Sequence, residues 1–538
     1  MNKLDLRDTN DRTFSKMLAR QAQQSPNTSF LITDAQSITF AEAEHVTARL
    51  AAGLSNTGLA KGDRVALLMG NRVEMVMLAL AINKLGAIWI PICTDYKGEW
   101  LLDTLQRSEC EALVTDSQYQ SRILEIAPKL SIPRTVLIDD GQASQLEGAI
   151  AYSELAASEP ISFEGLQLDY GDTCAILWTS GTTGKSKGVM QSYNVWVRAI
   201  VEGCSVQYDS REGDIIYCVL PLFNTAAWIT SIFRALIEGI PCVIEAKFSV
   251  TDFWARVEHF QATQTFAIGA MGVFLANAPA HENDAKTSLR VAQIVPMPPD
   301  LWGKFEQRFN LKLLRTGLGQ SECQLVLTQL ENREDVPVYA LGFPIADTEI
   351  SLRDDDGKEV SVGKAGEICI KPLAPYVLFN GYFNNPEATE QAYRDGWYLT
   401  GDMARQDPTT GTYFFVDRKK DALRYAGRNI STLEVESVLR RHPDVADVAV
   451  FGIASEEVES EHEVKINVVL RPGADQSHES LCEFINDNAP HYFVPRYMEF
   501  VESLPYTPTN KVQKFRLREI GVTQATWDRK QSSFEVKR

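Results

Sequence analysis

Ten residues that combine glycines, hydroxyls and lysines form the part of the sequence with the clearest chemistry. The stretch from Thr179 to Gly188 reads Thr-Ser-Gly-Thr-Thr-Gly-Lys-Ser-Lys-Gly, and it follows the apolar run from Cys174 to Trp178, which predicts a short buried strand. Glycines let the backbone turn back and present its N–H groups, hydroxyls add hydrogen-bond donors, and lysines add positive charge. This Gly/Thr loop (residues 179–188) therefore predicts a site for a polyphosphate.

Two better-known phosphate-binding motifs do not match the sequence. A Walker A loop needs a glycine five residues before Gly-Lys-Ser, and that position is Thr179. A dinucleotide fingerprint needs G-x-G-x-x-G, whereas the stretch that starts at Gly317 ends in Glu322. A flexible loop with incidental lysines is the simpler alternative, and the density of these residues directly after a strand disfavours it.

Together with four later motifs, the loop resembles that of the adenylate-forming superfamily, which includes acyl-CoA synthetases, peptide-synthetase adenylation domains and beetle luciferase. The resemblance covers essentially the whole chain and implies that ATP, Mg²⁺ and coenzyme A (CoA) are bound. In the first later motif, Gly-Leu-Gly-Gln-Ser-Glu, it implies that Glu322 supports Mg²⁺ and that Ser321 contacts the α-phosphate of ATP. A carboxylate oxygen suits this hard cation. Leu318 stands where the family usually stacks an aromatic ring on adenine.

The next two motifs imply contacts with the ribose and with CoA. Trp-Tyr-Leu-Thr-Gly-Asp ends in Asp402, whose two carboxylate oxygens can accept hydrogen bonds from both hydroxyls of a vicinal diol. Arg418 matches the family arginine near the ribose and phosphates, and Lys420 matches the hinge of the small domain. Gly427 lies in the loop expected to approach the pantetheine arm of CoA, where a side chain would obstruct the thiol.

The last motif, Leu-Pro-Tyr-Thr-Pro-Thr-Asn-Lys, ends in Lys511, which by resemblance bridges the substrate carboxylate and the α-phosphate. Asn510 replaces the usual glycine, and asparagine tolerates a positive φ better than other non-glycine residues. The expected catalytic residues are Lys511, Glu322 and Ser321, with Glu322 also the metal ligand. The expected nucleotide and CoA contacts are Thr179, Ser180, Gly181, Thr182, Thr183, Gly184, Lys187, Leu318, Gly319, Gln320, Asp402, Arg418, Lys420 and Gly427.

The resemblance places the acyl pocket between residues 221–224, 269–272 and 293–297. Gln-Ile-Val-Pro-Met occupies the last segment, where the family usually has Gly-Gly-Ala-Pro, and Asn224 replaces a common histidine, so a narrower pocket is expected. These segments most resemble the crotonobetaine/carnitine-CoA ligase group. A trimethylammonium substrate would favour an aromatic face. Trp178 and Trp228 are the candidates, although the core is the expected place for each.

The elements that must position these motifs alternate between strand and helix patterns from about Thr13 to Glu111 and again after the Gly/Thr loop. This alternation predicts an α/β fold with mostly parallel sheets, and a helix from Asp252 with Thr251 as its N-cap. Period-two segments after Val338 predict a small antiparallel β subdomain. We therefore expect an N-terminal adenylation domain at 1–418 and a mobile α+β C-terminal domain at 421–538, with a hinge at 419–420.

Composition narrows the partners. The 538 residues carry a formal net charge of −18, which disfavours nucleic acid and anionic membranes. The polar N-terminus does not resemble a signal peptide, and we identify no apolar run long enough for a membrane span. Nine cysteines without a CxxC pair predict reduced, mostly buried thiols and a cytoplasmic location. A homodimer is compatible with the sequence, which does not indicate oligomeric state.

The predicted activity is an AMP-forming acid–thiol ligase that joins a small-molecule carboxylate to CoA through an acyl-adenylate. One alternative is an adenylating enzyme that delivers its acyl group to a carrier protein or another acceptor. A second alternative is a regulatory nucleotide-binding protein with a decayed site, to which the changes at Leu318, Asn510 and Asn224 point. The identity of the carboxylic acid stays open.

Overall fold

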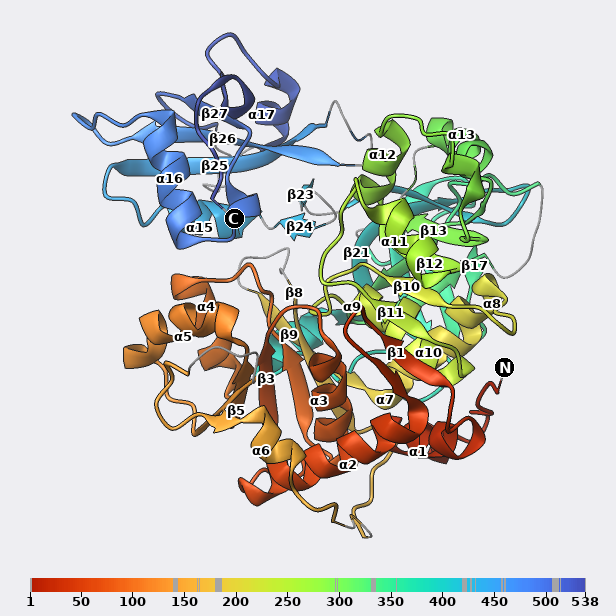
Figure 1. Cartoon of the computed structure of the whole chain (residues 1–538). Helices are drawn as coiled ribbons and strands as arrows, with labels where there is room; N and C mark the ends of the chain where they lie inside the picture. Colours follow the sequence, from red (N-terminus) through yellow and green to blue (C-terminus); the bar gives the residue numbers. More distant parts are fainter. Residues whose placement is uncertain are drawn as a thin grey trace.

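Figure 1 shows the computed structural model of the chain, in which a smaller C-terminal unit drawn in blue lies above one α/β layer, in red and orange, and beside a second one in green. The structure describes residues 2–138, 144–161, 163, 165–179, 186–295, 297, 299–329, 335–354, 356–418, 423–425, 428–430, 432–455, 458, 461–505, 512 and 514–537.

The first layer is a seven-stranded sheet in the order β7-β6-β5-β3-β4-β8-β9. Its strands are β3 (Arg64–Leu68), β4 (Ile88–Pro91), β5 (Ala112–Thr115), β6 (Arg134–Leu137), β7 (Ile150–Ala151), β8 (Thr173–Thr179) and β9 (Lys187–Ser192). All neighbours pair in parallel except β8 and β9. Alternate residues of β3 enter different apolar clusters, Val65 and Leu67 in one and Ala66 and Leu68 in another, because helices cover both faces.

The helices of this layer separate by face. Those in the cluster with Val65 are α2 (Phe40–Asn56) and α3 (Val73–Lys84), and those in the cluster with Ala66 are α4 (Gly98–Ser108) and α5 (Gln120–Ile126). The short helix α6 (Tyr152–Ala156) contacts α2.

The second layer is a seven-stranded sheet in the order β14-β13-β12-β10-β11-β1-β2. Its strands are β1 (Ser29–Ile32), β2 (Ser37–Thr39), β10 (Ile216–Cys218), β11 (Cys242–Ile244), β12 (Gln264–Ile268), β13 (Val291–Val295) and β14 (Lys312–Leu314). The helices of this part of the chain are α1 (Phe14–Gln24), α7 (Tyr193–Ala199), α8 (Ser205–Tyr208), α9 (Thr225–Ala227), α10 (Phe233–Glu238), α11 (Phe253–Phe260), α12 (Gly269–Asn277) and α13 (Pro299–Phe309).

Buried tryptophans join the two layers into one core. The ring centroid of Trp89 on β4 lies 6.2 Å from that of Trp196 on α7 and 4.5 Å from that of Trp228. All three side chains are fully buried in one cluster that draws on both sheets. The predicted α/β class with parallel sheets is therefore confirmed.

The predicted start of α11 is wrong by one residue, because Asp252 and not Thr251 is its N-cap. Ser249 closes a turn just before the helix: its hydroxyl donates to Asp252 Oδ2 at 2.7 Å and accepts from the Asp252 N–H at 3.3 Å. The Thr251 hydroxyl lies 3.1 Å from Ser249 Oγ, so it is engaged within the turn.

Antiparallel strands follow the second sheet, and the period-two pattern predicts those after Val338. One sheet contains β15 (Leu318–Gln320), β16 (Gln324–Thr328) and β17 (Phe343–Pro344), and the other contains β18 (Thr348–Arg353), β19 (Ala365–Pro372), β20 (Tyr393–Arg394), β21 (Trp397–Gln406) and β22 (Tyr413–Arg418). Helix α14 (Pro386–Gln391) precedes β20.

The C-terminal unit has its own four-stranded sheet and its own apolar core. After the hairpin of β23 (Leu423–Tyr425) and β24 (Arg428–Ile430), its elements are α15 (Thr432–Leu439), β25 (Val445–Ala454), β26 (His462–Leu470), α16 (His478–Asn488), β27 (Tyr497–Phe500), α17 (Lys514–Ile520) and β28 (Trp527–Asp528). In Figure 1 this unit lies over α4, and the ring of Trp100 on α4 meets that of Phe493 edge to face at 5.2 Å.

Two expectations from composition can be compared with the structure. Eight of the nine cysteines, all of them within the described residues, are buried, and none forms a disulfide, as predicted. In the part of the chain that the structure describes, no helix has the length and apolarity needed to cross a membrane.

Candidate active site

The ends of the Gly/Thr loop are held together by a β-hairpin. Thr179, the last residue of β8, pairs with Lys187, the first residue of β9. The Ser186 hydroxyl donates to the Thr179 carbonyl at 2.9 Å, and the Arg107 guanidinium donates to the Ser186 carbonyl at 2.7 Å. The expected contacts from Ser180 to Gly184 lie outside the described residues, so the structure describes the base of the loop.

Arg107 also stacks on the ring of the neighbouring Trp178. Its guanidinium carbon lies 4.6 Å from the ring centroid of Trp178, and the indole N–H of Trp178 donates to Ser108 Oγ at 2.8 Å. Trp228 is fully buried and donates to the Leu222 carbonyl at 2.6 Å. Both tryptophans therefore have partners within the protein: Trp228 belongs to the core, as expected, whereas Trp178 is partly buried and packs against a core cluster.

The turn that carries Glu322 connects β15 to β16 and depends on close backbone approach. A Cβ atom at Gly319 would lie 1.9 Å from the Gln324 carbonyl oxygen, so this position excludes any side chain. Ser321 and Glu322 are partly exposed at the turn. Gln191 on β9 donates a side-chain hydrogen bond to the Ser321 carbonyl, which ties the turn to the strand that leaves the Gly/Thr loop.

A buried arginine, Arg198, supports the turn of Glu322 through hydrogen bonds to its backbone. The side chain of Arg198 is 1% exposed and donates to the carbonyls of Cys323 at 3.2 Å and Leu325 at 2.9 Å. Its guanidinium also pairs with the carboxylate of Asp347 through two hydrogen bonds of 2.6 and 2.5 Å. Since a buried charge needs both a counter-ion and hydrogen bonds, these contacts place Arg198 in a single position.

Asp402 lies on β21 and is 3% exposed. Gln320 on β15 donates to Asp402 Oδ2 at 2.6 Å and to the Thr400 carbonyl at 2.9 Å, and it accepts from the Tyr398 hydroxyl at 3.0 Å. Arg418 on β22 pairs with Asp402 across the strands. Thus the two residues expected near the ribose are opposite each other, and Gln320 connects them to the Glu322 turn.

Leu318 is 8% exposed and packs in an apolar cluster of the antiparallel region with Leu327 and Tyr398. Its side chain therefore contributes to the core under the turn. This burial explains how an aliphatic residue can occupy the position without leaving exposed apolar surface.

Tyr382 joins the Gly/Thr loop to Glu322. Its hydroxyl donates to Glu322 Oε1 at 2.8 Å, and the Lys187 ammonium lies 4.5 Å from the centroid of its ring. Burial and the nearby Glu322 carboxylate raise the pKa of Tyr382 well above its usual range, so the phenol stays neutral and acts as a donor. A continuous set of contacts thus runs from Lys187 through Tyr382 to the turn of Glu322, and through Gln320 to Asp402.

The donor chemistry of this turn suits Mg²⁺. Glu322 offers carboxylate oxygen at a partly exposed position, and Mg²⁺ is commonly held by one or two carboxylates while phosphates and water complete its coordination. Among the described residues, no group of three or more His, Cys, Asp or Glu side chains could hold a metal ion by itself. The residues present therefore fit a cation that arrives with a polyphosphate.

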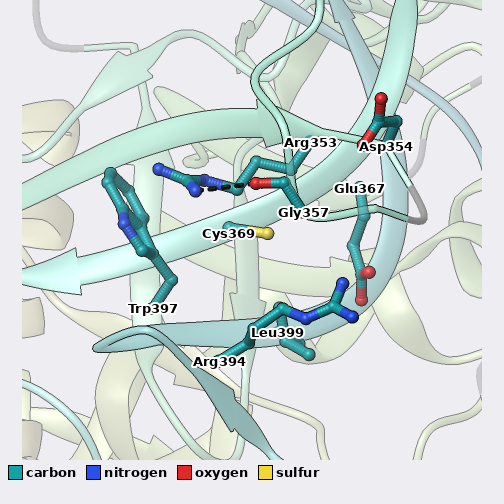
Figure 2. Close-up of a pocket in the computed structure, with 8 residues that line it drawn as sticks. All are labelled: Arg353, Asp354, Gly357, Glu367, Cys369, Arg394, Trp397 and Leu399. Atoms are coloured by element: carbon teal, nitrogen blue, oxygen red, sulfur yellow. Dashed lines mark hydrogen bonds between the residues drawn. The ribbon is translucent and has the colours of Figure 1, made fainter.

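A small pocket lies behind the Asp402 strand in the antiparallel subdomain (Figure 2). Its volume is about 50 Å³, which is far below the roughly 300 Å³ of the smallest ordinary ligand sites. Arg353 stacks over Trp397 at 4.2 Å, and Glu367 accepts a hydrogen bond of 2.9 Å from the backbone N–H of Gly401. Glu367, which lines the pocket, therefore supports the turn before Asp402, and the pocket itself is too small for a nucleotide.

Residues expected to line the acyl pocket have structural partners. Asn224 is the N-cap of α9, and its side chain accepts from the Ala226 N–H at 3.1 Å. Gln293 is buried and donates to Gln207 Oε1 at 2.8 Å and to the Arg315 carbonyl at 2.9 Å. These partners account for the two polar residues that depart from the family pattern, Asn224 in place of histidine and Gln293 in place of glycine.

Three further expected residues, Lys420, Gly427 and Lys511, also lie outside the described residues. Sequence reasoning missed four others that hold the site: Arg107, Gln191, Arg198 and Tyr382. Each lies far in sequence from its partner, 60 residues in the case of Tyr382 and Glu322, so no spacing pattern signals the contact.

Comparison with known proteins gives matches along most of the chain. The model of a family described as AMP-binding enzyme matches residues 18–383, and one described as AMP-binding enzyme C-terminal domain matches 434–511. A crotonobetaine/carnitine–CoA ligase from Salmonella typhi is 30% identical over 470 residues, which cover 86% of this chain and 89% of that protein.

Two solved structures are similar over nearly their whole length. A double mutant of o-succinylbenzoate CoA synthetase from Bacillus subtilis, bound with its product analogue, has a TM-score of 0.79 and 26% identity, covering 94% of this chain and 98% of that one. An amide bond synthetase from Marinactinospora thermotolerans has a TM-score of 0.79 and 25% identity, covering 94% of this chain and 99% of that one.

Proposed function

Because the chain belongs to the AMP-binding enzyme family, we propose that it is an ATP-dependent acyl-CoA ligase, an enzyme of the acid–thiol ligase class. In the first half-reaction, a substrate carboxylate oxygen attacks the α-phosphorus of ATP and pyrophosphate leaves, which gives an acyl-adenylate. In the second half-reaction, the CoA thiol attacks the acyl carbon and AMP leaves with the electrons of the broken C–O bond.

We assign the roles within this reaction as follows. The Gly/Thr loop binds the ATP phosphates, Asp402 and Arg418 bind the ribose region, and Ser321 contacts the α-phosphate. Lys511 stabilises the charge that develops on the α-phosphate, Lys420 is the hinge, and the Gly427 loop approaches CoA. Glu322 would hold Mg²⁺, which neutralises phosphate charge when it is bound.

One observation carries the proposal: the described groups assigned to ATP are joined by direct contacts. Lys187 lies over the ring of Tyr382, whose hydroxyl bonds Glu322. Two residues earlier, the Gln320 side chain bonds Asp402, and Arg418 lies opposite Asp402 in the backbone register of the two strands. These contacts support the proposal because adenylation requires groups that are already held in place, since fixed charges need no reorganisation during reaction.

The proposed substrate is a small carboxylic acid. The crotonobetaine/carnitine–CoA ligases among the relatives make betaine-like acids the first ones to test. Neither of the two candidate tryptophans supports a betaine-like substrate. Trp228 is buried, and the guanidinium of Arg107 already lies over the ring of Trp178. A panel should therefore include short-chain and cyclic acids beside the betaine-like ones.

The test is ATP-dependent release of pyrophosphate across this panel, with AMP and acyl-CoA quantified after CoA is added. We expect at least one acid to give pyrophosphate without CoA and a thioester with it. If no carboxylate releases pyrophosphate, the ligase proposal fails and the alternative of a regulatory nucleotide-binding protein gains support.

A second acceptor is favoured by one specific observation, the similarity to an amide bond synthetase. An acyl-adenylate attacked by an amine would give an amide in place of a thioester. Supplying CoA, a phosphopantetheine-loaded carrier protein or an amine to the enzyme that holds the acyl-adenylate separates the three acceptors. We expect CoA to give the fastest release of AMP.

A further inference from the structure

Tyr382 lies between two groups that the proposed reaction requires but that sequence motifs do not connect. Its side chain is 7% exposed, and its hydroxyl donates to Glu322 Oε1 at 2.8 Å. The ammonium of Lys187, the first residue of β9, lies 4.5 Å from the centroid of the same ring. One side chain thus contacts both the expected metal ligand and the lysine at the base of the Gly/Thr loop.

The backbone around Tyr382 makes this position rigid. On one side the segment pairs with β9: the Met190 N–H donates to the Gly381 carbonyl at 3.0 Å, and the Phe383 N–H donates to the Gly188 carbonyl at 2.7 Å. On the other side the Phe379 N–H donates to the Glu322 carbonyl at 2.8 Å. The segment 379–383 is therefore tied to the strand that leaves the loop and to the turn that carries Glu322.

A matched residue stands nearby. Tyr393 lies in the same aromatic cluster, with its ring stacked at 6.2 Å from Phe379, which in turn lies 4.9 Å from Tyr382. The hydroxyl that donates to Glu322 belongs to Tyr382. The two tyrosines thus share an environment and differ in their contact with the carboxylate.

We propose that Tyr382 is a positioning residue, which holds the Glu322 carboxylate toward the metal–phosphate group of ATP and holds Lys187 against the same phosphates. This inference rests on the proposed function, since it needs ATP and a divalent cation at this turn. The phenol O–H fixes one carboxylate oxygen, so Glu322 meets the cation without first losing side-chain freedom. Partners that orient a metal-binding carboxylate typically change metal affinity by about 10- to 100-fold when they are removed.

The test uses the full-length protein with Mn²⁺ as the probe and α,β-methylene-ATP as the nucleotide, and free Mn²⁺ is measured by electron paramagnetic resonance. For Tyr382→Phe, which keeps the ring over which Lys187 lies, we expect about tenfold weaker Mn²⁺ binding to the nucleotide complex. For the control Tyr393→Phe, we expect binding within twofold of the wild type. Tyr382→Leu, which also removes the ring, should in addition weaken binding of the nucleotide without metal.

A double-mutant cycle makes the result independent of general destabilisation. In a Glu322→Gln background, Tyr382→Phe should change Mn²⁺ affinity by less than twofold, because the carboxylate that it orients is gone. The inference is overturned if Tyr382→Phe binds Mn²⁺ as the wild type does, if Tyr393→Phe loses as much, or if the loss persists in the Glu322→Gln background. If one of these results is found while the wild type releases pyrophosphate, the role of Tyr382 is refuted and the proposed ligase function stands. If the wild type binds no nucleotide, the role of Tyr382 and the proposed function both fail.

Discussion

The Glu322 turn and the face between α4 and the C-terminal unit are held in different ways. Buried, charge-assisted hydrogen bonds hold the turn, as Arg198 pairs with Asp347 and caps the carbonyl of Cys323. The interdomain face includes an edge-to-face contact between the partly buried ring of Trp100 and the buried ring of Phe493, and a 3.7 Å contact between the His491 and Asp95 side chains.

We therefore expect the Glu322 turn to be preassembled and the contacts of the interdomain face to break and reform. The groups around the turn lose little freedom when ATP binds, because their partners already hold them. A ring contact and a 3.7 Å His–Asp contact are weaker than buried, charge-assisted hydrogen bonds, and we expect inter-domain contacts of this kind to permit relative motion. The proposed two half-reactions need both properties, a fixed nucleotide site and a C-terminal unit that moves.

The largest expected effect tests the rigid side of the comparison. Replacing Arg198 by Leu leaves the Asp347 carboxylate and two carbonyls without their donor, so the free energy of unfolding should fall by about 3–5 kcal/mol. Urea denaturation measures this change. The control is Arg211→Leu, because Arg211 and Asp209 form an exposed pair 3.3 Å apart, and its cost should stay below about 1 kcal/mol. An equal loss in the free energy of unfolding for the two variants would show that Arg198 stabilises the Glu322 turn no more than an exposed ion pair stabilises the surface.

The next largest effect concerns Lys511, which we place in the moving unit. Lys511→Ala should slow adenylation by about 10²- to 10³-fold, because charge that develops on the α-phosphate loses its counter-ion. Thioester formation from supplied acyl-AMP should persist. The measurements are pyrophosphate exchange and acyl-CoA formation, with Lys537→Ala as a control at an exposed position of the same unit. Full pyrophosphate exchange in the Lys511 variant would refute the assignment.

A third prediction tests whether the interdomain face responds to pH. Burial raises the pKa of Glu434 on α15 to about 8; Arg107 on α4 opposes this shift, and Asp103 on α4 adds to it. A carboxyl with a raised pKa binds its proton more tightly in the docked state, so docking is strongest at low pH. It should weaken as pH rises from about 4.5, the ordinary pKa of glutamate, to about 8, by at most about tenfold per pH unit.

Glu434→Gln should remove this part of the pH dependence, since the amide does not titrate. Fluorescence energy transfer between labels on the two domains measures docking from pH 5 to 9. A wild type and a Gln variant with parallel pH curves would show that Glu434 does not titrate at the interface. The difference between the two proteins also cancels any titration of His491, which both retain.

The smallest effect tests the apolar part of the same face. Trp100→Ala removes the edge-to-face partner of Phe493 and should weaken docking by about 1 kcal/mol, roughly fivefold. Small-angle scattering should show a larger open population, while the unfolding of the N-terminal core stays unchanged. Tyr339→Ala is the control, because Tyr339 is 51% exposed and packs on Phe414 within the N-terminal part. A scattering profile equal to the wild type would exclude a docking role for Trp100.

Local patterns predict the fold well. The strand predicted at 174–178 is part of β8, the predicted alternation of strands and helices gives two mostly parallel sheets, and the two family models confirm the superfamily resemblance. The N-cap of α11 is predicted one residue too early, at Thr251 in place of Asp252, and the Thr251 hydroxyl is engaged in the turn at Ser249. Apolar repeats of two and 3.6 residues lie within a single element, so the sequence is enough to recognise them.

By itself, the sequence determined the order of the motifs, the residue types that can bind phosphate and a diol, and the α/β class. Only the tertiary structure decided which side chains hold them. Tyr382 meets Glu322 across 60 residues, Gln320 meets Asp402 across 82, and Arg198 meets Asp347 across 149. Such pairs depend on how sheets and turns pack, and a periodicity that spans only a few residues carries no information about which distant segments will meet.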